Sequence, residues 1–164
     1  MFVVERSLGA GMLLAAGLAI GLSFAGRADT AVPSDSGVVK VRSHYTINET
    51  IDRLKHNIAD KGITFFTEID QAKLAAANGI KTQPSTLLVF GNPALGTQFI
   101  TANPSAGLDW PVRLLVTQDA TGAVWAQYTD FHWIARRHHI RNRDAVFNMA
   151  SEVIASITTS IEEK

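Results

Sequence analysis

The sequence predicts an α+β domain in which a mainly antiparallel sheet and a layer of covering helices form two layers. Short apolar runs of strand length alternate with segments whose apolar residues recur at helical spacing. The tetrapeptide Asp119-Ala120-Thr121-Gly122 separates two of these runs and is typical of a hairpin turn, so at least one strand pair is antiparallel. The expected order is strand, helix, strand, helix, strand, helix, hairpin and helices. This order suits a two-layer α+β domain better than a doubly wound sheet.

Length and composition limit the possible classes of protein. The chain has 164 residues and 46% hydrophobic content, which fits one domain with an appendage. It contains no cysteine, which excludes disulfides, thiolate catalysis, iron–sulfur ligation and covalent attachment of c-type haem. The formal net charge is zero, so the overall charge indicates neither nucleic acid nor an anionic membrane surface as a partner.

The N-terminal region is uncharged from Ser7 to Gly26, between Arg6 and Arg27. As a helix this segment would span about 30 Å, the thickness of the hydrocarbon core of a bilayer. Residues 1–26 are therefore either a cleaved signal peptide or an uncleaved anchor helix. Signal cores are usually about 7–15 residues long, so the greater length here favours the anchor. Both alternatives predict export to the periplasmic side of the inner membrane, as an anchored or a secreted protein.

A polar linker is predicted over residues 27–37, followed by the domain over residues 38–164. The first strand is expected over 38–45. A helix should follow it, because Thr46 and Glu49 form a capping box and apolar residues recur at helical spacing behind them. Gly62 suits the left-handed position after this helix. The next elements are a strand over 63–70 and a short helix over 71–78.

The second half of the domain is predicted from similar local signals. Strands are expected over 84–90, 110–118 and 123–129, helices over 93–102 and 131–138, and a loop over 105–109. Asn142 is expected to cap a last helix. Its predicted buried face consists of Val146, Met149, Val153, Ile157 and Ile161.

Several motifs of the second half, in the same order, resemble the bacterial domain-of-unknown-function family 302. They are Leu88-Val89-Phe90-Gly91-Asn92-Pro93-Ala94-Leu95-Gly96-Thr97, Asn103-Pro104 with Gly107-Leu108-Asp109-Trp110-Pro111, Val124-Trp125 with Tyr128, and Ile134-Ala135-Arg136-Arg137-His138. The similarity covers residues 38–140. It implies a small α+β domain with an antiparallel sheet, often dimeric. It implies no reaction, because the family has no settled common activity.

The chain departs from the family pattern at two positions. Many members have Asp-His-Ala after the second strand, where this chain has Asp70-Gln71-Ala72, so a ligand set that uses that histidine would be broken here. Members also tend to have glycine directly after Arg-His, where this chain has His139. A left-handed backbone is less favourable for histidine than for glycine, so the helix is expected to continue through this position.

Histidines are the first candidates for a functional site. The chain has five of them: His44, His56, His132, His138 and His139. His132 and His139 would share a face of a continuous helix, and a histidine pair can bind haem or a divalent metal. The alternative is that they are solvated residues near a helix end. His138 belongs to the Arg-His motif of the family, and His138 and His132 are the metal-ligand candidates.

Basic residues form the second candidate. Arg136, Arg137, Arg141 and Arg143 surround His138 and His139, and Trp133 precedes them. Together these side chains would suit a phosphate, haem propionates or an acidic protein partner. The alternative is a solvated charged face. Nucleic acid is not expected, because the domain is nearly neutral and is predicted to be exported.

The Gly91-Asn92-Pro93 segment lies at a strand-to-helix transition and is interpreted as a structural junction, with Asn92 as N-cap and Pro93 in the first helical turn. Its backbone amides could also face an anion. No Gly-x-Ser-x-Gly, His-Glu-x-x-His or paired-carboxylate signature indicates an enzyme. Asp109 and Asp130 are isolated acids in expected loops and are predicted to be capping residues.

The resulting hypothesis is an exported, non-enzymatic binding or accessory domain, tethered to the membrane by residues 7–26. It would act through protein contacts in a membrane complex or a homodimer, and no cofactor is predicted. The alternative is a periplasmic haem- or metal-binding protein that uses His138 and the neighbouring arginines. A hydrolase without a recognisable signature is a third hypothesis.

Overall fold

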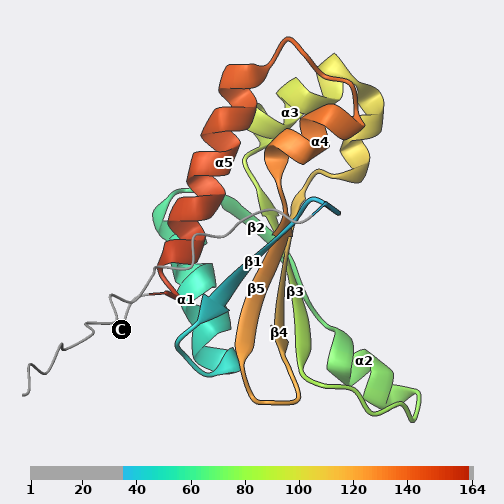
Figure 1. Ribbon diagram of the computed structural model, residues 1–164, viewed down its shortest axis with the longest axis vertical. Helices are drawn as coiled ribbons and strands as arrows, with labels where there is room; N and C mark the ends of the chain where they lie inside the picture. Colours follow the sequence, from blue (N-terminus) through green and yellow to red (C-terminus); the bar gives the residue numbers. More distant parts are fainter. Residues whose placement is uncertain (1–34, 163–164) are drawn as a thin grey trace, which may run out of the picture.

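A computed structural model of the chain describes residues 35–162, which form a five-stranded sheet with helices packed on one of its faces (Figure 1). The strands are β1 (Val38–Ser43), β2 (Thr64–Asp70), β3 (Ser85–Gly91), β4 (Val112–Gln118) and β5 (Val124–Thr129). The helices are α1 (Ile47–Asp60), α2 (Gln71–Ala77), α3 (Pro93–Ala102), α4 (Phe131–Arg137) and α5 (Asp144–Thr159), with a short 3₁₀ helix, η1 (Pro104–Leu108), after α3.

The strand order is β1-β5-β4-β3-β2, and every neighbouring pair is antiparallel. The predicted α+β class with an antiparallel sheet covered by helices is therefore confirmed. β1 and β2 are the two edge strands, and α1 connects them. The expected N-terminal hydrophobic helix lies outside the described residues. Within residues 35–162, no helix has the length and apolar character needed to cross a membrane.

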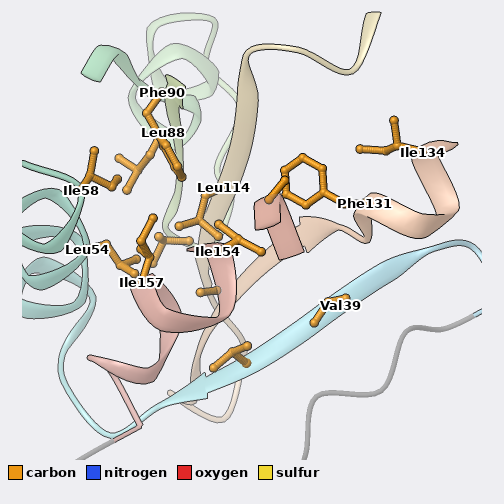
Figure 2. Packing of buried hydrophobic residues seen from close by; sticks show 14 of the residues in the cluster. Val39, Leu54, Ile58, Leu88, Phe90, Leu114, Phe131, Ile134, Ile154 and Ile157 are labelled. Atoms are coloured by element: carbon orange, nitrogen blue, oxygen red, sulfur yellow. The ribbon is translucent and has the colours of Figure 1, made fainter. Parts of the chain in front are cut away.

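The hydrophobic core lies between one face of the sheet and the helices α1 and α5. Leu88 of β3 and Leu114 of β4 are neighbours across the strand pair, and both side chains are fully buried. Leu54 and Ile58 of α1 and Ile157 of α5 pack around them (Figure 2). Burial of the alternate residues of each strand produces this face. Residues that point the other way, such as Leu87, Leu115 and Trp125, are half-buried.

The capping interactions predicted at the two ends of α1 are present. The Thr46 side chain accepts a hydrogen bond from the Glu49 amide, and Glu49 Oε2 accepts one from the Thr46 amide at 3.1 Å. Hydrogen bonds from the hydroxyl and backbone amide of Thr46 lower the pKa of Glu49. The backbone of Gly62 is left-handed, with φ 64°.

The predicted hairpin turn is also present between β4 and β5. Asp119 Oδ1 accepts from the amides of Thr121 at 2.9 Å and Ala123 at 3.0 Å, and Oδ2 accepts from Trp125 Nε1 at 3.0 Å. The hydrogen bonds from the side chains of Thr121 and Trp125 lower the pKa of Asp119 to about 2. The carboxylate therefore remains ionised and fixes the turn at any ordinary pH.

The prediction for α5 is wrong in two respects. Asn142 does not cap the helix: the N-cap residue is Arg143, which makes no side-chain capping bond. Of the predicted buried face, Ile157 and Ile161 are fully buried, but Val146 and Val153 are only half-buried and Met149 is 55% exposed. The buried residues of the helix are Phe147, Ala150, Ile154, Ile157 and Thr158. The helix is apolar over a wide arc, and its orientation is set by Phe147, which stacks on Phe99 with 4.3 Å between ring centres.

The expectation that α4 continues through His139 is also wrong. The helix ends at Arg137, and His139 adopts a left-handed backbone with φ 54°. The amide of Ile140 then donates to the carbonyl of Ala135 at 2.9 Å, and the Ile140 side chain is buried. Returning Ile140 to the core offsets the unfavourable backbone of His139. Residues 105–108 of the predicted loop belong to η1 (Pro104–Leu108).

Candidate functional site

The most buried ionisable residues of the described chain meet at the carboxylate of Asp109. This side chain is 3% exposed, and its Oδ2 lies 2.6 Å from Nε2 of His138, whose side chain is 5% exposed. Because an ionised carboxylate can only accept hydrogen bonds, Nε2 of His138 is the donor. The pair is shielded from water, so its charge and hydrogen bonds have to be satisfied by protein groups.

Two arginines satisfy the remaining acceptor capacity of this carboxylate. Nη1 of Arg137 lies 3.1 Å from both Asp109 oxygens. Nη2 of Arg113 lies 3.2 Å from Oδ1 and also donates to the carbonyl of Leu108 at 2.7 Å. The Arg113 and Arg137 side chains are 51% and 44% exposed. We call Asp109, Arg113, Arg137 and His138 the Asp109 cluster.

The Asp109 cluster joins three segments that are distant in the sequence. Asp109 directly follows η1, Arg113 belongs to β4, and Arg137 and His138 end α4. A further bond reinforces the same junction: Nδ2 of Asn103 donates to the carbonyl of His138 at 2.8 Å. Both carboxylate oxygens and Nε2 of His138 are thus engaged with protein groups. The cluster therefore cross-links these three segments of the domain and acts as a structural lock.

The predicted basic cluster is divided by the fold. Arg137 binds Asp109, and Arg143 donates to the carbonyl of Asn142 at 2.9 Å. Arg136 and Arg141 instead line a shallow surface depression between α4 and α5, in which no carboxylate of residues 35–162 forms an ion pair with either of them. Its other lining residues are His132, Ala135, His139, Ile140 and Asp144. We call it the basic depression.

The basic depression brings His132 and His139 together by a route different from the predicted one. Their spacing suggested one face of a continuous helix, but α4 ends between them, and both residues line the depression although His139 has a left-handed backbone. Exposed arginine and histidine donors around a hollow can bind an anionic group. The acid Asp144 reduces the net positive charge there.

Trp133 of α4 packs against the start of the domain. The guanidinium carbon of Arg137 lies 5.5 Å from the centre of its ring. Gly37 packs against the same ring so closely that any Cβ at this position would overlap the indole, and its φ of 76° also favours glycine. The carbonyl of Gly37 accepts from the amide of Asp130 at 2.8 Å, and Asp130 itself caps α4 as predicted.

Binding of haem or a metal ion by His138 remains a prediction, and the position of Asp109 restricts it. Nε2 of His138 is bound to Asp109, so a metal at this atom would have to displace the carboxylate. Within residues 35–162, no group of three histidine, cysteine, aspartate or glutamate side chains is arranged to hold a metal ion.

Elsewhere in the domain, burial, with smaller contributions from Asp130 and Glu162, raises the pKa of Tyr128 to about 12.

The junction at the end of β3 is built around Asn92. Its Oδ1 accepts from the amides of Ala94 at 3.0 Å and Leu95 at 3.3 Å, and Pro93 occupies the first turn of α3. Gly91 lies under Trp110, where a Cβ would come within 3.0 Å of the indole nitrogen. The side chain of Asn92 is thus occupied by helix capping.

Replacing Asn92 tests this assignment. Asn92→Ala is expected to lower the free energy of unfolding by about 0.5–2 kcal/mol, because two amides of α3 lose their acceptor. Asn92→Asp and Asn92→Gly should lower it by only a few tenths. Denaturant midpoints of the three variants provide the measurement. A midpoint of Asn92→Ala equal to that of the wild type would show that the cap contributes nothing and would return Asn92 to the candidate ligand-binding residues.

Comparison with known proteins identifies the family. The family model described as "Domain of unknown function DUF302" matches residues 39–163, which include nearly all of the described domain. The chain belongs to the DUF302 family. A crystal structure of an uncharacterised DUF302 protein from Bacillus stearothermophilus superposes with a TM-score of 0.70 at 17% sequence identity, covering 76% of this chain and 98% of that one. This similarity shows the fold alone.

Curated relatives of this DUF302 chain have a more specific name. It is 37% identical over 106 residues to a "Fluoride-specific ion channel FluC 1" of Brucella suis biovar 1, covering 65% of this chain and 42% of the relative. The match to a protein of the same name from Brucella abortus biovar 1 has the same identity and covers 39% of that relative. The chain thus spans about two fifths of the length of the curated relatives it matches.

The sequence did not predict the central residue of the Asp109 cluster. Asp109 was expected to be an isolated capping acid, but it is the buried acceptor of the Asp109 cluster. Its position within the Gly107-Leu108-Asp109-Trp110-Pro111 motif was the available signal. The long-range partners of Asp109 are Arg137 and His138, which belong to the Arg-His motif.

Proposed function

We propose that this chain is an exported accessory domain, tethered to the membrane by residues 7–26, that acts through protein contacts and not as an enzyme. The partner we propose is a membrane transport protein of the ion-channel class. The observation that supports this is the match to proteins named fluoride-specific ion channels, of which the chain covers only 42% and 39%. Domains that occur within a longer polypeptide in one protein often act as separate partners in another.

The geometry of the domain is consistent with binding by protein contacts. Both carboxylate oxygens of Asp109 already accept hydrogen bonds within the domain, so this carboxylate is not free to bind a ligand. Arg136 and Arg141 lack a carboxylate partner among residues 35–162, so acidic side chains of a partner would suit the basic depression. Each exposed ion pair contributes only about 0.2–1 kcal/mol, so several together would be needed.

The test is co-purification of the full chain, expressed at native level and extracted in mild detergent at low salt. An integral membrane transport protein is expected to co-elute. The double variant Arg136→Gln/Arg141→Gln should recover less of it, and raising the salt concentration should have the same effect, because exposed charges are screened. Arg137 is left unchanged, since it binds Asp109.

The matched control is Lys73→Gln/Lys81→Gln, which removes two exposed charges at and after α2 and should leave recovery unchanged. If both double variants recovered equal amounts of the membrane protein, at low and at high salt, binding through the basic depression would be contradicted. The intact mass of the recovered chain tests the tether in the same sample. A mature protein that begins after residue 26 would contradict anchoring and leave a released domain.

A further inference from the structure

Helix α5 is apolar on two adjacent stripes, although only one of them packs on the sheet. Phe147, Ala150 and Ile154 belong to the buried stripe. The second stripe contains Met149, which is 55% exposed, and Val153 one turn further on, which is half-buried. An exposed methionine beside other apolar side chains is typical of surfaces that adapt to apolar ligands, because its side chain is flexible and polarisable.

This second stripe forms one side of a surface groove. The groove runs between α5, the start of β2 and the N-terminal end of α3. Its apolar residues are Ile63, Leu95, Met149 and Val153, and its charged residues are Lys61 and Glu152. Lys61 and Glu152 form no ion pair with each other, and neither has a partner among the ion pairs of residues 35–162. The groove thus combines an apolar surface with one unpaired positive and one unpaired negative charge.

The groove adjoins a cavity in the core. Ile63, Asn92, Leu95 and Val153 line both of them, so the cavity lies behind the groove. Its inner residues include Phe90, Trp110, Phe131 and Ile154, which come from different elements, and Figure 2 shows Phe90, Phe131 and Ile154 around this part of the core. The cavity measures about 40 Å³. Apart from Asn92, whose Oδ1 caps α3, and the indole of Trp110, its lining side chains are apolar, so a water there would lack the two to four polar partners it needs.

We propose that the groove and cavity bind one single-chain zwitterionic amphiphile of the lysophospholipid type. At about 40 Å³ the cavity is too small for a ring system and holds only the end of an unbranched hydrocarbon chain, whose remainder lies along Met149 and Val153. A phosphate near Lys61 and an ammonium near Glu152 would pair both free charges of the groove. An anionic or a cationic headgroup would pair one of them and face repulsion from the other.

This inference goes beyond the proposed function and does not depend on it. It can be tested on residues 35–164, because the Bacillus stearothermophilus chain is matched over 98% of its length and so consists of this domain and little else. The probe is decylphosphocholine below its micellar concentration, followed by calorimetry. One molecule should bind per domain in a saturable manner. Octylphosphocholine should bind about 15-fold more weakly, since each buried methylene contributes about fourfold.

Recognition of the headgroup is tested separately, with other headgroups and with variants of the charged residues. Decanoate and decyltrimethylammonium should each bind more weakly than decylphosphocholine. Lys61→Gln and Glu152→Gln should each weaken decylphosphocholine by up to about fivefold, the range of an exposed ion pair. Met149→Glu should abolish binding, because it places a charge against the hydrocarbon chain. Lys73→Gln on α2 is the matched control and should bind as the wild type does.

All these residues are exposed, so the variants should fold, and unchanged thermal midpoints verify this. Absence of saturable binding, or affinity that does not depend on chain length, would overturn the proposal. So would binding unchanged by Met149→Glu. Equal affinity for the three headgroups would overturn the assignment of Lys61 and Glu152 as headgroup ligands.

Discussion

Asp109→Ala is expected to lower the free energy of unfolding by about 3–5 kcal/mol, because it removes one partner from a buried charged network. His138 would remain buried with Nε2 unpaired, and Arg137 would lose both of its bonds to the carboxylate. The half-exposed arginines can turn toward water, so His138 carries most of the effect. Urea denaturation of the wild type and the variant, analysed with a common slope, is the measurement.

The control for this prediction is Arg113→Gln. Arg113 contacts the same carboxylate, but its side chain is 51% exposed, so its loss should lower the free energy of unfolding by no more than about 1 kcal/mol. A double-mutant cycle between Asp109→Asn and His138→Gln should show a coupling of about 0.5–3 kcal/mol. If Asp109→Ala were as stable as the wild type, the cluster could not be a structural lock, and its carboxylate would become a candidate for ligand binding.

The strands and helices were predictable because local signals determine them. The capping box at Thr46, the turn around Asp119 and the cap at Asn92 each use groups within a few residues of one another. Such interactions are encoded in short stretches of sequence, and the structure contains all three.

The candidate site was only partly predictable, because its contacts join distant segments. Arg137 and His138 were identified from their motif, but their partner Asp109 lies 28 and 29 positions earlier. Nothing local distinguishes a buried acceptor from a capping acid in a loop. Arg136 and Arg137 are adjacent and chemically identical, and only the direction of α4 separates the one that lines the basic depression from the one bound to Asp109.

Long-range packing also overrode two local preferences. The left-handed backbone of His139 follows from the return of Ile140 to the core, which periodicity in α4 cannot reveal. The face of α5 that is buried depends on Phe147 meeting Phe99. Because α5 is apolar on two stripes, the sequence alone could not decide which stripe packs on the sheet. The stripe that remains outside lines the groove.

Gly96→Ala is expected to lower the free energy of unfolding by about 1–3 kcal/mol, the usual effect of overpacking a core. In an exposed helix the same substitution would stabilise by about 1 kcal/mol, because alanine favours the helix more than glycine does. Here the sign reverses: Gly96 lies within α3, and an added Cβ would overlap the indole of Trp110. Trp110 would have to leave its edge contact with Phe66, where the ring centres are 6.2 Å apart.

The measurement is the denaturant midpoint together with tryptophan emission, since a displaced Trp110 should become more exposed and emit at longer wavelength. Gly107→Ala is the matched control: no heavy atom lies within 4 Å of a Cβ at that position. This control should leave the midpoint and the emission unchanged. Because Trp110 also forms a wall of the core cavity, Gly96→Ala should weaken decylphosphocholine binding as well. A Gly96→Ala variant as stable as the wild type, with unchanged emission, would mean that Trp110 does not pack on α3 and that the cavity has a different wall.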